Sequence, residues 1–277
     1  MGEESASSKV LVSGVGHGRG DERPVRPLIE IEQVSKRFPI RGGFTEALQD
    51  VSFDIARDEL LSLIGPSGCG KTTILKLIGD ILPVSSGRIL VNGKTPSQAR
   101  RQRGFGFVFQ DPVLLPWRTV EQNVRLFHEV IGDGRRSEVH QHVQDLIELV
   151  GLQGFEHHYP AELSGGMQQR VSIARALSFD PQILLMDEPF GALDLITRDK
   201  MGLELLRIWE RARKTVLLVT HSITEAVYLS DRVVVFSPRP ARVLRIVEVE
   251  LPRPRPPEIR DEPVFHAYVR DLRALLE

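Results

Sequence analysis

The chain has 277 residues, of which 26% are charged and 41% hydrophobic, and its formal net charge is −1. This composition is typical of one α/β domain with appendages. The near-neutral charge argues against nucleic acid as a partner, because nucleic-acid binding usually leaves a strongly basic surface. A single cysteine, Cys69, excludes an internal disulfide and fits a reducing compartment.

The first 27 residues are rich in Gly, Ser and charged residues and have no sustained hydrophobic period, so we expect 1–27 to be a disordered arm. Acidic residues follow Met1-Gly2, where a signal peptide has basic ones. No apolar stretch approaches the ~18 to 20 residues that span a bilayer. The sequence therefore predicts no membrane-spanning segment.

Alternating apolar residues predict two strands before the first glycine-rich loop, at 28–35 and 47–55. Phe38 falls between them. An aromatic ring at this place could stack on a nucleotide base, or it could be a core or turn phenylalanine. The sequence leaves both interpretations open.

The stretch that dominates the chain is 60–73, L-L-S-L-I-G-P-S-G-C-G-K-T-T. It reads as a buried strand, a glycine loop and the start of a helix, and Gly65, Gly70, Lys71 and Thr72 match the phosphate-binding pattern G-x-x-x-x-G-K-[ST]. Glycines let backbone N–H groups surround an anion, and the helix start adds its positive dipole end. The lysine can reach the terminal phosphates, and the Thr72 hydroxyl can ligate Mg²⁺. This stretch predicts binding of a nucleoside triphosphate.

The composition changes at Asp111, where a proline-punctuated loop carries apolar residues that look exposed. A capping box at Thr119 and Gln122 predicts a helix over 120–131. A second amphipathic helix is predicted over 137–150. We expect this region to be a helical insertion into a core built on a sheet.

A second anion site is a candidate within the insertion, where the sequence is L-S-G-G-M-Q-Q-R at 163–170. Ser164 suits a helix N-cap, and Gly165 and Gly166 leave the first-turn N–H groups of the next helix open to a ligand. A lone Ser-Gly-Gly is most often only a helix cap. In a chain with a phosphate loop, it is a candidate for gripping a γ-phosphate.

Two carboxylates follow the apolar strand 183–186. At the carboxyl end of a parallel strand beside the phosphate loop, Asp187 would hold Mg²⁺, and Glu188 would orient or deprotonate a water. Such a pair is commonly just a helix cap or turn, but its position after a buried strand favours catalysis.

A histidine ends the next predicted strand, 215–220, and His221 could donate to a phosphate oxygen. Ser222 and Glu225 predict a capping box for the helix that follows. Beyond residue 237 the sequence predicts a peripheral strand or two, a polyproline-type linker at 252–257 and a terminal helix over 261–276.

Taken in order, G-P-S-G-C-G-K-T-T, Gln110, L-S-G-G-M-Q-Q-R, I-L-L-M-D-E-P, A-L-D and His221 resemble the motifs of the ATP-binding subunit of an ABC transporter, over about residues 28–237. Softer features, such as L-L-P-W-R-T-V-E-Q-N-V and F-G-A-L-D-L-I-T-R, are similar to the nitrate/sulfonate/taurine group of importer ATPases. The resemblance implies an α/β fold with a P-loop NTPase core of ABC type. The implied domains are a core at 28–110 and 179–237 with a mixed sheet, a helical signature subdomain at 111–178, and a small C-terminal appendage at 238–277.

The resemblance also implies roles for individual residues. Glu188 would be the general base, with His221, Gln110 and Lys71 completing the catalytic group. Thr72, Gln110 and Asp187 would surround Mg²⁺. The ATP-binding residues would be Phe38, Gly65, Pro66, Ser67, Gly68, Cys69, Gly70, Lys71, Thr72, Thr73, Ser164, Gly165, Gly166 and Asp194.

The partners that the resemblance implies are a second copy of the chain and a membrane permease. Two copies would form a head-to-tail homodimer with ATP between them, and a solute-binding protein would act indirectly through the permease. The expected location is the cytoplasmic face of the inner membrane, and the expected cargo is a small anion such as nitrate, a sulfonate or taurine. No nucleic acid is expected.

The rival interpretation is an ABC ATPase that acts on nucleic acid or ribosomes. Chromosome-type members need long coiled-coil insertions, and translation-type members carry two cassettes, whereas this sequence has no such heptad run and one P-loop. A P-loop kinase is a third interpretation, but it leaves L-S-G-G and His221 unexplained.

Overall fold

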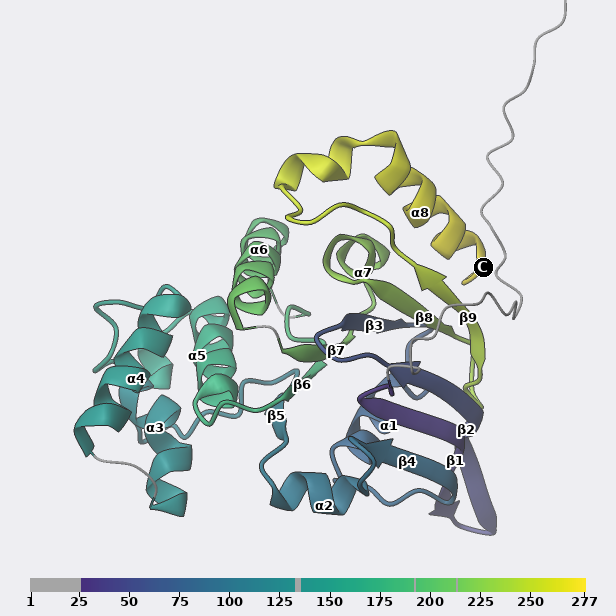
Figure 1. The fold of residues 1–277 in the computed structure, drawn as a ribbon, viewed down its shortest axis with the longest axis horizontal. Helices are drawn as coiled ribbons and strands as arrows, with labels where there is room; N and C mark the ends of the chain where they lie inside the picture. Colours follow the sequence, from purple (N-terminus) through teal and green to yellow (C-terminus); the bar gives the residue numbers. More distant parts are fainter. Residues whose placement is uncertain (1–25, 133–135, 192, 213) are drawn as a thin grey trace, which may run out of the picture.

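A computed structural model describes residues 26–132, 136–191, 193–212 and 214–277. The predicted N-terminal arm lies outside these described residues except for its last two positions. Two sheets lie one above the other, with helices on both faces of the larger one (Figure 1).

The larger sheet has the strand order β5-β6-β7-β3-β8-β9. The first five strands are parallel and β9 is antiparallel to β8, so the predicted mixed α/β sheet is confirmed. Its strands are β5 (Phe105–Val108), β6 (Ile183–Asp187), β7 (Thr215–Val219), β3 (Leu60–Ile64), β8 (Arg232–Phe236) and β9 (Val243–Glu248).

The central strands are apolar throughout because both faces of the sheet are covered. In β3, Leu61 and Leu63 face one hydrophobic cluster, and Leu60 and Ile64 face the other. Side chains on a strand alternate between faces, so a single short strand supplies both cores. Both β3 and β6 are buried at every position, up to the residues that follow them at their carboxyl ends.

The smaller sheet is antiparallel, with the order β2-β1-β4, and α1 (Lys71–Ile78) packs between it and the larger sheet (Figure 1). Its strands are β1 (Ile29–Ile40), β2 (Gly43–Ile55) and β4 (Ser86–Val91).

The first two strands are longer than predicted, so Phe38 lies inside β1 and not in a connection between strands. The hydrophobic pattern stops at Ser35, but the ladder continues and pairs Phe38 with Thr45. Both faces of this hairpin end are largely exposed, so hydrophobic alternation carries no signal there.

Four helical elements lie between β5 and β6 and form the left side of the molecule (Figure 1). They are α3 (Val120–Ile131), α4 (Arg136–Leu149), η1 (Pro160–Glu162) and α5 (Gly165–Leu177). The predicted capping box is present, because Thr119 Oγ1 accepts from the Gln122 N–H and the Gln122 side chain accepts from the Thr119 N–H.

The other helices are α2 (Pro96–Arg101), α6 (Leu195–Ala212), α7 (Ile223–Leu229), η2 (Pro257–Asp261) and α8 (Pro263–Ala274). The segment predicted as a linker is packed against α7, and its Arg255 is only 4% exposed. In the ranges that the structure describes, no helix is both long enough and apolar enough to cross a membrane.

Candidate nucleotide-binding site

The phosphate loop joins β3 to α1 and adopts backbone angles that favour glycine. Gly68 has φ 69° and Gly70 has φ 134°. A Cβ on Gly70 would lie 2.7 Å from Leu48 Cδ2 and 3.0 Å from the Ala47 carbonyl oxygen, so no larger residue fits without a shift. No described side chain caps α1, which leaves its first-turn N–H groups open to an anion.

Lys71 is buried within this loop, at 6% exposure. Its Nζ donates to the carbonyl oxygens of Gly65, at 2.8 Å, and Pro66, at 3.0 Å. The ammonium group is therefore already folded over the loop where a phosphate would be bound. Cys69 is also buried, as expected for a small residue that fills space.

Asp187, at the carboxyl end of β6, and Thr72, in the first turn of α1, lie together. The Thr72 hydroxyl donates to Asp187 Oδ1 at 2.8 Å. Burial raises the pKa of Asp187, although the hydrogen bond from Thr72 and the charges of Lys76 and Lys71 act in the opposite direction. A divalent cation here would offset the cost of burying this carboxylate.

The donors present fit Mg²⁺, which prefers oxygen ligands and keeps positions for phosphate oxygens and water. Thr72 supplies a hydroxyl and Asp187 a carboxylate. Within the described ranges, no group of three or more His, Cys, Asp or Glu side chains is placed to hold a metal ion. A Mg²⁺ site at this position would therefore be completed by the nucleotide.

Glu188 and His221 form the second pair at this edge of the sheet. His221 Nδ1 lies 3.2 Å from Glu188 Oε2, and the histidine side chain is 54% exposed. Glu188 has φ 46°, and its N–H donates to the Val219 carbonyl at 2.9 Å. A non-glycine residue held in this conformation costs roughly 1–3 kcal/mol, and such strain is frequent at functional sites.

Gln110 is exposed and follows β5, the neighbour of β6. The sequence interpretation missed Gln169, whose Nε2 donates to the Phe109 carbonyl at 3.3 Å and which is 3% exposed. This bond ties α5 to the residue before Gln110. The sequence offered no signal for this role beyond the position of Gln169 within L-S-G-G-M-Q-Q-R.

Phe38 is half-buried, so it is neither a core residue nor a turn residue. Lys36 Nζ lies 5.2 Å from the centroid of its ring. Part of the ring remains accessible to a stacking partner.

The signature residues form the start of α5. Ser164 is the N-cap, and its Oγ accepts from the Met167 N–H at 3.3 Å. A Cβ on Gly166 would lie 3.0 Å from Thr197 Cγ2, whereas a Cβ on Gly165 would meet nothing within 4 Å. The predicted N-cap is confirmed. Because Gly165 has no side chain, the first turn of α5 stays open toward the outside of the chain.

Asp194 caps α6 beside this helix start. Its Oδ1 accepts from the Thr197 N–H at 3.0 Å, and hydrogen bonding at Thr197 lowers the pKa of Asp194. Gly166 and Asp194 thus meet at the same residue, Thr197. Among the described residues, no hydrogen bond joins this group to the phosphate loop.

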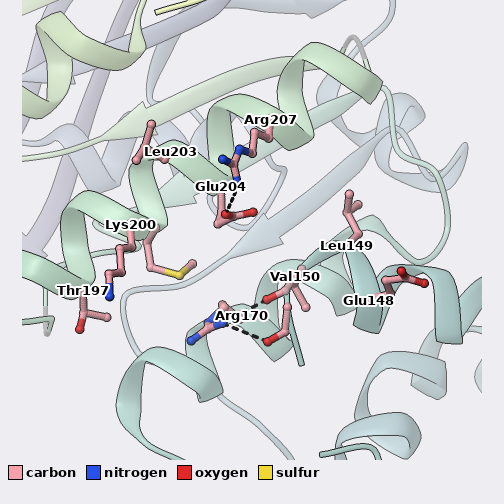
Figure 2. Close-up of a pocket in the computed structure, with 11 residues that line it drawn as sticks. Glu148, Leu149, Val150, Arg170, Thr197, Lys200, Leu203, Glu204 and Arg207 are labelled. Carbon is pink, nitrogen blue, oxygen red and sulfur yellow. Dashed lines mark hydrogen bonds and ion pairs between the residues drawn. The ribbon is translucent and has the colours of Figure 1, made fainter. Parts of the chain in front are cut away.

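A cavity of about 490 Å³ lies between the helical insertion and α6 (Figure 2). Arg170 Nη1 donates to the carbonyls of Val150 and Gly151 at its floor, at 3.4 and 3.2 Å. None of the predicted site residues lines it. The lining residues are Glu148, Leu149, Val150, Gly151, Arg170, Thr197, Lys200, Met201, Leu203, Glu204 and Arg207.

Comparison with known proteins agrees with this geometry. The family model described as ABC transporter matches residues 48–191. The aliphatic sulfonates import ATP-binding protein SsuB of Bacillus cereus is 42% identical over 227 residues, covering 82% of this chain and 88% of that protein. The taurine import ATP-binding protein TauB of Jannaschia sp. is 44% identical over 216 residues, covering 78% and 80%.

Solved structures of one transporter cassette are also similar. The dimeric structure of MJ0796, a bacterial ABC transporter cassette, is 33% identical with a TM-score of 0.73, covering 80% of this chain and 99% of that chain. A post-hydrolysis dimer of the same cassette, bound to ADP and phosphate, is 32% identical with a TM-score of 0.72 and the same coverage. With its phosphate loop, carboxylate pair and signature helix in place, the chain belongs to the ABC transporter family of ATP-binding proteins.

Proposed function

We propose that this chain is the ATP-hydrolysing subunit of an ABC importer, and that it energises uptake of a small anionic solute such as nitrate, a sulfonate or taurine. The observation that carries the proposal is the meeting of the phosphate loop, the Thr72–Asp187 pair and the Glu188–His221 pair at one edge of the large sheet. The names of the sulfonate and taurine relatives support import as the direction and a small anion as the cargo.

The chain's own residues bind the nucleotide in three ways. The loop from Gly65 to Thr73 surrounds the phosphates with N–H groups, and the ring of Phe38 stacks on the base. Lys71 exchanges its carbonyl partners for phosphate oxygens, which it can do without a large movement because Nζ is already over the loop.

Catalysis uses the carboxylates after β6 together with His221. When bound, Mg²⁺ would neutralise phosphate charge, held by Thr72, Asp187 and Gln110. Glu188 takes a proton from the attacking water, and His221 holds that water and the γ-phosphate in register. Their separation of 3.2 Å lets the imidazole orient the carboxylate.

The signature surface acts on ATP held by a second copy. Gly165 leaves the N-terminus of α5 open, which supports an approach by a second copy to Ser164, Gly165 and Gly166. In a head-to-tail homodimer each such surface completes the other copy's site. Hydrolysis then removes the γ-phosphate contacts that favour the closed dimer.

The permease would bind the loop that precedes α3, at the cytoplasmic face of the inner membrane. Val113 is 60% exposed and Trp117 is 70% exposed. Arg175 anchors this loop, because Nη1 donates to the Val113 carbonyl at 2.8 Å and Nη2 to the Pro112 carbonyl at 2.9 Å. A solute-binding protein would deliver the cargo to the permease on the other side.

The catalytic assignment is tested by Glu188→Gln. We expect ATP binding to persist, kcat to fall by about 10²- to 10⁴-fold, and dimers to accumulate with ATP, since the amide cannot accept the proton. Glu148→Gln, at the exposed end of α4, is the matched control and should change none of these. Wild-type turnover by the Glu188 variant would refute the assignment of the base.

The head-to-tail arrangement is tested by mixing two inactive variants, Lys71→Ala and Ser164→Arg. Each mixed dimer then contains one composite site with an intact phosphate loop and an intact signature. We expect the mixture to hydrolyse ATP when neither variant does so alone. If the mixture stays inactive although mixed dimers form, each site is completed within one chain.

A further inference from the structure

A ring of hydrogen bonds closes around the backbone of His221, behind its contact with Glu188. The Thr220 hydroxyl donates to Glu225 Oε2 at 2.6 Å and accepts from the Ser222 N–H at 3.0 Å. The Ser222 hydroxyl in turn accepts from the Glu225 N–H at 3.3 Å. Because His221 lies between Thr220 and Ser222, the ring holds its main chain on both sides.

This ring differs from the capping box that the sequence predicts at Ser222 and Glu225. In a capping box the glutamate side chain accepts from the N-cap N–H. Here the Ser222 N–H donates to Thr220, and the Glu225 carboxylate accepts from Thr220 instead. The hydroxyl of Thr220 therefore bridges the Ser222 N–H and the Glu225 carboxylate, and Thr220 is only 3% exposed.

The ring is fixed to the strands that carry the rest of the site. The Thr220 N–H donates to the Leu63 carbonyl of β3, at 3.2 Å, just before the phosphate loop. The Glu188 N–H donates to the carbonyl of Val219, the preceding residue, at 2.9 Å. A change in the orientation of Thr220 would therefore move His221 relative to Glu188.

The other carboxylate oxygen of Glu225 lies beside a small cavity that Arg198 also lines. Glu225 and Arg198 both line a cavity of about 250 Å³, and Glu225 Oε1 and Arg198 Nε are buried with no hydrogen-bond partner among the described residues. Burial raises the pKa of Glu225, and the hydrogen bond from Thr220 and the charge of Arg198 oppose that rise. Arg198 Nη2 also donates to the Leu193 carbonyl at 3.2 Å, next to Asp194.

We infer that Glu225 is a positioning residue for ATP hydrolysis, an inference that rests on the proposed function. Through Thr220 it holds the backbone of His221 in the orientation that faces Glu188. Across the shared cavity its charge acts on Arg198, whose guanidinium donates to the loop before α6. The proposed effect of Glu225 on hydrolysis is exerted through His221.

The first test removes the hydroxyl that closes the ring. Thr220→Val keeps the shape of the side chain, and we expect kcat to fall by about tenfold to a hundredfold with KM for ATP nearly unchanged, since misplacing a catalytic group slows the chemical step. Thr220→Ser should restore most of kcat. Thr224→Ala removes a neighbouring exposed hydroxyl, 3.0 Å from Ser222 Oγ, and should leave kcat unchanged. A wild-type kcat in folded Thr220→Val would overturn the inference.

A double-variant cycle separates positioning from a loss of stability. In a His221→Ala background, Thr220→Val should slow hydrolysis little further, because the group it positions is already absent. Losses that multiply in both backgrounds would overturn the inference. Glu188→Gln keeps this outcome apart from a failure of the proposed function: a normal rate in that variant contradicts the catalytic assignment itself.

A second double-variant cycle tests whether Glu225 and Arg198 act together. Glu225→Gln keeps an oxygen for Thr220 but loses the charge that faces Arg198, and Arg198→Met loses the other side. We expect the double variant to have nearly the kcat of either single variant. Independent, multiplicative losses would remove Arg198 from the inference and leave only the Thr220 ring.

Discussion

Gly165 and Gly166 are neighbours in the chain, yet the missing Cβ has a different consequence at each. At Gly166 it allows close packing on Thr197, 3.0 Å from where a Cβ would be. At Gly165 it leaves open space in front of the first turn of α5. Only the first absence is explained by packing within this chain, and the open space at Gly165 is compatible with the proposed approach of a second copy.

The variant Gly165→Ala fills the open space in front of α5 and leaves the packing at Gly166 unchanged. We expect the melting temperature to stay the same or rise, because alanine favours a helix over glycine by about 1 kcal/mol. ATP binding to the monomer should also be unchanged, while ATP-dependent dimerisation and turnover fall. Calorimetry and size-exclusion chromatography with ATP measure these quantities, and wild-type dimerisation in this variant would contradict an approach at Gly165.

At the scale of elements, α5 connects parts of the site that lie far apart in the sequence. It begins at the signature, reaches Phe109 through Gln169 and holds the loop before α3 through Arg175. Burial lowers the pKa of Arg175, and the two carbonyls that accept from its guanidinium offset part of the cost of burying the charge. A rotation of this helix would therefore displace both the residues beside Gln110 and the loop proposed to bind the permease.

The loop before α3 is held from its other side by Asn123, which is completely buried. Asn123 Oδ1 accepts from the Leu115 N–H at 2.9 Å, and Nδ2 donates to the carbonyls of Leu115, Arg118 and Thr119. These bonds shape the exposed face around Trp117 without contributing to that face.

Asn123→Ala should lower the free energy of unfolding by about 1–3 kcal/mol, because it leaves buried backbone groups unpaired. It should also weaken assembly with the permease. Trp117→Ala is the matched surface variant, and we expect it to weaken assembly with no change in stability. Denaturant unfolding and co-purification with the permease separate the two effects. Normal assembly by both variants would exclude this loop as the docking surface.

At the scale of the whole molecule, the C-terminal segment completes the core. β9 pairs with β8, and α8 buries Phe265, Val269 and Leu272 in the same cluster as the central strands. Arg255 donates to the carbonyls of Val227, Tyr228, Ser230, Val249 and Leu251. One buried cation thus joins the end of α7 to the residues that follow β9.

Arg255→Met should lower the free energy of unfolding by at least about 2 kcal/mol, since hydrogen bonds to a charged group are each worth roughly 1.5–3 kcal/mol. Burial lowers the pKa of Arg255 to about 10, so the side chain remains protonated and able to donate at neutral pH. Exposed Arg245→Met on β9 is the control. Equal unfolding midpoints for the two variants would show that the segment is not anchored by Arg255.

The sequence by itself determined the local chemistry of this protein. The phosphate loop, the Ser164 cap and the carboxylates after an apolar strand all depend on residues that are close in the chain. Backbone conformation at Gly70 and the order of strand and helix are short-range properties. For that reason they could be read directly, as could the capping box at Thr119.

Only the tertiary structure decided how distant polar groups are paired. The hairpin end that contains Phe38 has no hydrophobic alternation, so its strand was missed. Thr220 and Glu225 take part in a ring of hydrogen bonds in place of a capping box, and Arg255 donates to carbonyls that follow α7 and β9. A buried polar group takes whichever partner the packing brings near, and that partner is set by the fold and not by spacing along the chain.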